Sequence, residues 1–151
     1  MSKFVYAIYI RTTAEKPWDA LTNPEFTRSY WCGTRHECIW EPGSPWRLMI
    51  PDGRVGDSGE VVAIERPRRL VLLWRNEFMP ELRAEGYSRA TFEIEPVGDT
   101  VRLTLTHEID RERSKLIDGV SNGWPAILSS LKSFLETGDA LDLTRHWPEN
   151  L

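Results

Sequence analysis

Between residues 34 and 109 the sequence repeats one pattern, in which short segments of alternating apolar and polar residues are separated by turn residues. Alternation with a period of two is typical of strands that bury one face. Links this short join antiparallel neighbours. The pattern predicts six consecutive strands, at residues 34–40, 45–50, 58–65, 69–76, 87–95 and 101–109. Such a sheet has one apolar face, which another element must cover.

The segment that can cover this face is a predicted helix at residues 114–138. Ser114 is a suitable N-cap, and Gly138 is a suitable residue to end the helix. Pro125 predicts a kink near residue 121 or, alternatively, a break at Asn122–Gly123. One face of the helix is apolar and comprises Trp124, Ile127, Leu128, Leu131, Phe134 and Leu135.

A strand at residues 4–11 and two short helices, at residues 13–23 and 24–31, precede the repeated pattern. The whole order predicts an α+β fold, in which an antiparallel sheet of about seven strands packs on one long C-terminal helix. The length of 151 residues suits one domain, expected at residues 1–138. A tail at residues 139–151 follows, in which Trp147 is the residue expected to dock.

The composition argues against several classes of protein. With 19 basic and 23 acidic side chains the formal net charge is −4, so we expect no nucleic-acid partner. No apolar run reaches the ~18 residues of a membrane span. The N-terminal MSKFVYAIYIRTT is predicted to be a strand and not a signal peptide. Two cysteines make no disulfide framework, so we expect a cytoplasmic location.

The segment WCGTRHECIW, at Trp31–Trp40, is the candidate metal or redox site because it contains Cys32, His36 and Cys38. A structural zinc site needs four ligands, with closely spaced cysteine pairs. A redox pair favours two cysteines separated by two residues. The segment offers neither arrangement, so we expect two free cysteines, no metal ion and no cofactor.

The chain contains seven tryptophans, which is many for one small domain. Trp31, Trp46, Trp74 and Trp124 fall on four different predicted elements, and each is expected to point into the same interior. Two interpretations stay open. The tryptophans either fill an aromatic core or line an apolar cavity for a ligand.

Several short motifs, in a fixed order, are similar to those of a known superfamily. The motifs are Trp18 followed by NPEF, YWCG at Tyr30–Gly33, PG at Pro42–Gly43, GEVVAIERPRRLVLLW at Gly59–Trp74, LTLTHE at Leu103–Glu108, and GWPAILSSLKSFLETG in the last helix. The chain resembles the SRPBCC superfamily of START-like (Bet v-like) helix-grip proteins. Within it, the chain is similar to the branch of the C-terminal domain of the activator of the heat-shock protein 90 ATPase. The resemblance covers residues 4–138, and Cys32 departs from the common pattern.

The resemblance implies a curved sheet around the long helix, with a cavity between them that holds a small apolar or amphipathic molecule. Phe78, Met79 and Tyr87 border the long connection between the strands predicted at residues 69–76 and 87–95. They are expected to cover the cavity. The residues expected to contact a ligand are Trp31, Trp46, Leu48, Trp74, Phe78, Tyr87, Phe92, His107, Trp124 and Leu128.

Two residues are weaker candidates for catalysis. His107 lies on the apolar face of its strand. It is either a core histidine that hydrogen-bonds to a hydroxyl or carbonyl group, or a functional residue in the cavity. In the second case it binds a polar group of the ligand or acts as a general acid–base. Glu60, Val62 and Ile64 are alternate residues of one predicted strand, so a regular strand places their side chains on the same face. Glu60 is therefore either an inward carboxyl group with a raised pKa or a rim residue paired with an arginine.

Three functions remain open from the sequence. The first is binding of a small apolar or amphipathic molecule, without catalysis. The second is a cyclase or hydrolase that uses His107 and Glu60. The third is a protein-interaction module like the chaperone activator, although the resemblance covers one domain of that activator and we do not expect a chaperone partner. A homodimer, through an exposed strand or the tail, is a further expectation.

Overall fold

The computed structural model describes residues 1–151 and contains one antiparallel sheet with four α-helices. The strands are β1 (Ser2–Ile10), β2 (Arg35–Glu37), β3 (Pro45–Met49), β4 (Val55–Glu65), β5 (Arg69–Asn76), β6 (Ser88–Val97) and β7 (Thr100–Ile109). The helices are α1 (Glu15–Thr22), α2 (Pro24–Tyr30), α3 (Pro80–Arg83) and α4 (Lys115–Thr137), followed by a 3-10 turn at Asp142–Thr144.

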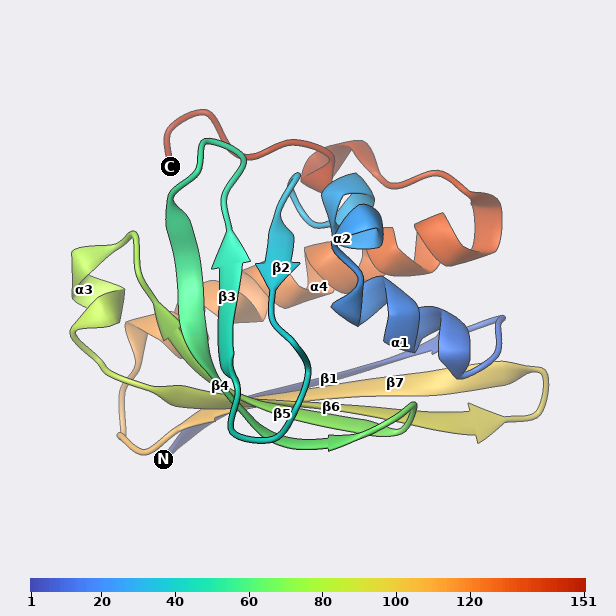
Figure 1. Cartoon of the computed structure of the whole chain (residues 1–151), viewed down its shortest axis with the longest axis horizontal. Coiled ribbons are helices and arrows are strands. Elements are labelled where there is room, and N and C mark those ends of the chain that lie inside the picture. The colour runs from blue at the N-terminus through green and yellow to red at the C-terminus, as the bar shows by residue number, and fades with distance from the viewer.

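The seven strands lie in the order β1-β7-β6-β5-β4-β3-β2, and all neighbours are antiparallel. Figure 1 shows the sheet curled around α4, with α1 and α2 beside that helix. The predicted α+β helix-grip fold, with about seven strands, two short helices after the first strand and one long C-terminal helix, is therefore confirmed. No helix combines the length and the apolar character that crossing a membrane requires.

The inner face of the sheet is set by the register of its strands. Val61, Leu72, Ala90 and His107 follow one another across β4, β5, β6 and β7, and all four are buried. The alternation along each strand keeps this row apolar, apart from His107. The predicted inward position of His107, towards the helix, is confirmed.

Helix α4 is continuous from Lys115 to Thr137, so the alternative break at Asn122–Gly123 is wrong. The Oγ of Ser114 accepts a hydrogen bond from the Ile117 amide at 3.1 Å, as an N-cap does. Gly138 ends the helix with a φ of 87°, a left-handed conformation that favours glycine. Packing against the sheet holds the helix together through Pro125.

Two strand boundaries differ by three residues from those expected. Strand β2 is only three residues long, whereas residues 34–40 were predicted. Strand β4 begins at Val55 and not at residue 58. The glycines and aspartates before residue 58 are typical of a turn, but pairing with β3 extends the strand through Gly56 and Asp57. Asp57 is therefore a strand residue.

An irregularity in β4 decides between the two orientations that the sequence leaves open for Glu60, and the residue is exposed. The register shifts between Val61 and Ala63, where β4 forms a bulge against β5. A bulge inserts one extra residue into the strand. Alternate residues before the bulge and after it therefore point to opposite faces of the sheet. Glu60 and Val62 are exposed, while Ile64 packs against the core.

Gly59 lets β4 pass close to β5, and a substitution there tests this packing. A Cβ atom at Gly59 would lie 1.7 Å from the Leu73 carbonyl oxygen, so Gly59→Ala requires the backbone to move. We expect a loss of about 1–3 kcal/mol in the free energy of unfolding, measured by urea denaturation. Gly119→Ala is the control, because a Cβ atom there meets nothing within 4 Å. Equal stability of the two variants would contradict the prediction.

Candidate functional site

A cavity of about 310 Å³ lies between α4 and the sheet. Its walls are mostly apolar. The sheet contributes Leu48, Asp57, Trp74 and Asn76; α4 contributes Leu116, Gly119, Val120, Gly123, Trp124 and Ile127; the segment after β5 contributes Phe78, Met79 and Leu82; the turn after α2 contributes Trp31, Cys32 and Thr34; and the C-terminal segment contributes Trp147, Pro148 and Leu151.

Three tryptophans form one aromatic cluster along the cavity. The ring centroids of Trp31 and Trp74 are 6.2 Å apart and nearly parallel, and Trp124 meets both rings edge-on at 5.4 Å. Trp46 lies behind Trp74, with centroids 4.4 Å apart. Trp46 and Trp74 both pair with Gly59, which has no side chain to separate them. The four tryptophans thus converge as predicted, and three of them line the cavity.

The side chain of His107 joins α4 to the sheet through hydrogen bonds. The indole Nε1 of Trp124 donates to its Nδ1 at 3.0 Å, so the proton of the neutral ring is on Nε2. Nε2 then donates to the Ser88 Oγ at 2.8 Å. The Ser88 hydroxyl in turn donates to the Trp74 carbonyl oxygen at 2.8 Å. Each polar side-chain atom in this series of hydrogen bonds, from Trp124 through His107 to Ser88, therefore has a partner.

These contacts describe a core histidine. The His107 residue is 0% exposed, and burial lowers the pKa of its imidazole to about 4. Both ring nitrogens are occupied, so neither is free to exchange a proton with a substrate. Glu60 lies on the opposite face of the sheet, on a strand separated from β7 by β5 and β6. The two candidates for catalysis do not meet.

The structure also separates the members of the WCGTRHECIW segment. His36 is buried, and its Nδ1 accepts a hydrogen bond from the Trp46 Nε1 at 2.8 Å. Burial lowers the pKa of His36 to about 3. The Cys38 thiol lies 3.6 Å from the Ser44 hydroxyl, and Cys32 lies on the cavity wall in a left-handed turn with φ of 53°. No group of three or more His, Cys, Asp or Glu residues could hold a metal ion.

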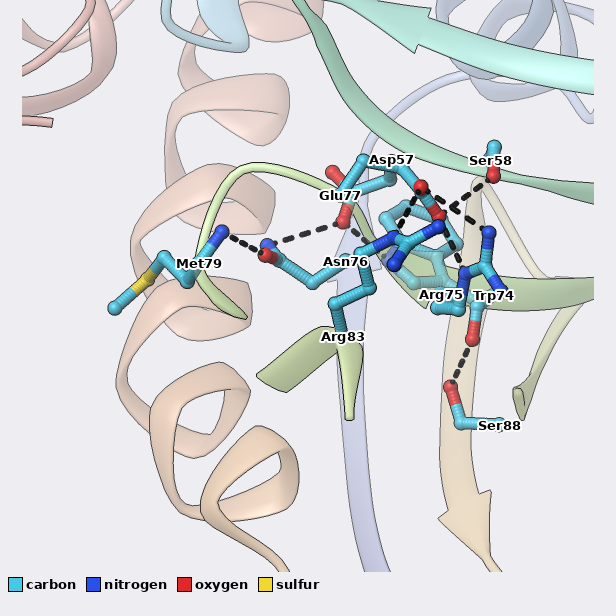
Figure 2. Close-up of polar contacts among 9 residues, drawn as sticks. All are labelled: Asp57, Ser58, Trp74, Arg75, Asn76, Glu77, Met79, Arg83 and Ser88. Atoms are coloured by element: carbon cyan, nitrogen blue, oxygen red, sulfur yellow. Dashed lines mark hydrogen bonds and ion pairs between the residues drawn. The ribbon is translucent and has the colours of Figure 1, made fainter. Parts of the chain in front are cut away.

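Asp57 is the acidic side chain of the cavity wall, and its position was not foreseen because it was assigned to a turn. Its Oδ1 accepts hydrogen bonds from the Trp74 Nε1 at 2.9 Å and from the Asn76 Nδ2 at 3.4 Å (Figure 2). Loss of hydration raises the pKa of Asp57 to about 7, although Trp74 and Asn76 oppose the shift. Its Oδ2 accepts no hydrogen bond from the protein and is not sealed from solvent.

Asn76 also positions the segment that borders the cavity. Its Oδ1 accepts a hydrogen bond from the Met79 amide at 2.9 Å, which holds the start of the connection between β5 and β6 (Figure 2). Glu77, which follows Asn76 in the sequence, forms ion pairs with Arg75 at 2.6 Å and with Arg83 at 3.1 Å. Both arginines are thereby paired with Glu77, and Asp57 forms no ion pair.

Half of the predicted ligand contacts lie on the cavity wall, namely Trp31, Leu48, Trp74, Phe78 and Trp124. The other half do not. Trp46, Phe92, His107 and Leu128 are buried in the core around it. Tyr87 is 50% exposed on the outer face of the sheet, with the Arg75 guanidinium 4.8 Å from its ring centroid. It precedes the inward Ser88, so alternation turns it outward.

The C-terminal segment closes one side of the cavity. The Cys32 amide donates to the Thr144 carbonyl oxygen at 2.7 Å, and the Trp147 ring packs edge-on against Phe78 with centroids 5.2 Å apart. Arg54 donates to the Leu151 carbonyl oxygen at 2.9 Å. Residues far apart in the sequence thus meet over the cavity, and only the docking of Trp147 was expected from the sequence.

The sequence and the fold were compared with known proteins. Residues 11–136 match the family described as Activator of Hsp90 ATPase homolog 1-like protein. No curated protein sequence matches the chain significantly. The protein MLL2253 from Mesorhizobium loti has a similar structure, with a TM-score of 0.77 and 24% identity over 91% of this chain and 99% of that one.

Two further solved structures show the same fold at lower identity. The Aha1 dimer from Colwellia psychrerythraea has a TM-score of 0.74 and 20% identity, over 91% of this chain and 98% of that one. PFC0360w, an HSP90 activator from Plasmodium falciparum, has a TM-score of 0.72 and 21% identity, over 88% of this chain and 95% of that one.

Replacement of His107 tests its role in joining α4 to the sheet. His107→Leu leaves the Trp124 N–H without an acceptor, and an unpaired buried polar group destabilises a protein. We expect a loss of about 1–3 kcal/mol in the free energy of unfolding, measured by urea denaturation. His146→Leu is the matched control, because His146 is exposed and forms no hydrogen bond. A His107→Leu chain as stable as this control would refute the role.

Asp57 should make stability depend on pH. Its pKa in the folded chain, about 7, exceeds the ~3.9 expected in the unfolded chain. The contribution of Asp57 to the free energy of unfolding is therefore fully present below about pH 4, and it is lost as the pH rises through about 7. Relative to the wild type, Asp57→Asn should gain about 1 kcal/mol per pH unit across this window. Urea denaturation at several pH values measures the difference, and a constant difference would contradict the assignment.

Proposed function

We propose that this chain, which belongs to the Activator of Hsp90 ATPase homolog 1-like family, binds a small apolar or amphipathic molecule in the cavity between α4 and the sheet. The observation that carries the proposal is the cavity itself. Its volume of about 310 Å³ lies at the lower end of the range found for ligand sites. A mostly apolar wall with a few polar groups is also typical of such sites.

The residues of α4 that line the cavity support the proposal. Gly119 and Gly123 are four positions apart, so they lie on one face of the helix. Each glycine costs about 1 kcal/mol of helix stability relative to alanine. A Cβ atom at either position would meet nothing within 4 Å, so packing does not require glycine there. The two glycines keep open a space that larger side chains would fill.

The two alternatives have less support in the geometry. A cyclase or hydrolase that uses His107 lacks a free nitrogen on that ring. An interaction module like the HSP90 activator from Plasmodium falciparum needs no internal cavity, although the similar fold keeps this alternative open. Homodimer formation, seen for the relative from Colwellia psychrerythraea, is a separate proposal for this chain that size-exclusion chromatography with light scattering tests.

Substitution of Gly123 tests the cavity without disturbing the core. Gly123→Leu places an apolar side chain in the cavity while it removes a helix-destabilising residue. We expect unchanged or higher stability, together with a loss of about tenfold or more in affinity for the apolar fluorophore N-phenyl-1-naphthylamine, a difference of about 1.4 kcal/mol. Fluorescence titration measures the affinity.

Gly123→Ala is the matched control, because it improves the helix equally and fills little of the cavity. It should bind the fluorophore nearly as the wild type does. Equal binding by the Leu and Ala variants, or no binding by the wild type, would count against the cavity as the ligand site. Native mass spectrometry of the chain purified from its own host then identifies the ligand by mass.

A further inference from the structure

The charge on the cavity wall is unbalanced. Asp57 is the only acidic side chain that lines the cavity, and no Lys, Arg or His side chain lines it. Asp57 forms no ion pair with any residue. Arg75 and Arg83 are both bound to Glu77. A carboxylate in a mostly apolar space lacks the compensation that buried charges ordinarily have.

The two oxygens of Asp57 differ in their surroundings. Oδ1 accepts from the Trp74 Nε1 and the Asn76 Nδ2, which fixes the orientation of the carboxylate in the wall (Figure 2). Oδ2 has no protein donor and is not completely buried, and the Asp57 side chain lines the cavity. The carboxylate is thus positioned by one oxygen and free to accept a hydrogen bond with the other. A ligand that donates a proton there completes its hydrogen bonding.

The aromatic side chains on the wall favour the same kind of ligand group. Trp31, Trp74, Trp124, Trp147 and Phe78 all line the cavity. The faces of aromatic rings attract cations, and tryptophan does so most strongly. A hydrogen bond between an ammonium group and a carboxylate is shorter and stronger than one between neutral groups. A cationic donor can therefore bind the free oxygen in a cavity that is lined with aromatic rings.

We infer that the cavity binds a hydrophobic amine, with an apolar body between α4 and the sheet and a protonated amino group on the Oδ2 of Asp57. The inference rests on the proposed function, because it names the class of ligand for the same cavity. The volume of about 310 Å³ suits a small amine with one apolar chain or ring system. An anionic ligand such as a fatty acid is disfavoured, because its carboxylate would face Asp57 with no cation between them.

Three ligands of equal chain length test the inference. n-Octylamine carries a cation, 1-octanol a neutral donor and octanoate an anion. Each is titrated into the wild-type chain at about pH 8, where a primary amine is protonated, and binding is followed by tryptophan fluorescence and calorimetry. We expect n-octylamine to bind about tenfold more tightly than 1-octanol, because its hydrogen bond is charge-assisted. Octanoate should bind most weakly.

Two variants complete the experiment. Asp57→Asn keeps the shape of the side chain and removes its charge, so it should abolish the preference for n-octylamine and leave the affinity for 1-octanol nearly unchanged. Asp110→Asn removes the same charge from an exposed residue without ion pairs and should bind all three ligands as the wild type does. If Asp57→Asn does not fold, the ranking of ligands by the wild type decides.

The outcomes separate the inference from the proposed function. If 1-octanol binds and n-octylamine binds no more tightly, the cavity is a ligand site and the amine assignment is wrong. The same holds if octanoate binds best, or if Asp57→Asn keeps the preference for the amine. If none of the three ligands binds, and N-phenyl-1-naphthylamine also fails to bind, the proposed function and the amine assignment are both wrong.

Discussion

The structure depends on one chain of hydrogen bonds that joins α4 to the sheet, from the Trp124 indole through His107 and Ser88 to the Trp74 carbonyl oxygen. Apolar packing alone lets a helix rotate or slide on a sheet, because it has little directional preference. A fully satisfied polar network inside a core permits one arrangement. The network therefore fixes which face of α4 meets the sheet, and with it which residues of α4 line the cavity.

Once α4 is fixed, side-chain size along the helix decides where the cavity opens. The N-terminal half presents Gly119, Val120 and Gly123 to it, whereas Leu128 and Leu131 are 0% exposed and fill the interior farther along. The helix can carry two glycines in its first half because its stability comes from packing and not from propensity. The core and the cavity are thus two ends of one interface between helix and sheet.

The fold could be predicted because it follows from periodicity. The alternation of apolar residues places His107 and its row correctly on the inner face. The orientation of Glu60 could not be predicted, because the bulge between Val61 and Ala63 reverses parity, and single residues do not mark a bulge. The position of Asp57 on the cavity wall was missed for a related reason. The segment around Asp57 is typical of a turn, but pairing with β3 makes it part of a strand. Which tryptophans line the cavity and which fill the core depends on packing between distant segments.

Asp57 is the residue whose presence is hardest to explain by folding alone. The Trp74 N–H needs an acceptor, but the carbonyl oxygen of an asparagine meets that need without a charge. An ionised carboxyl group in this position opposes folding near neutral pH, since burial raises its pKa to about 7. Groups that reduce stability are commonly retained at sites that bind ligands. The carboxylate with one free oxygen, in a cavity that two glycines keep open, has the form of such a site.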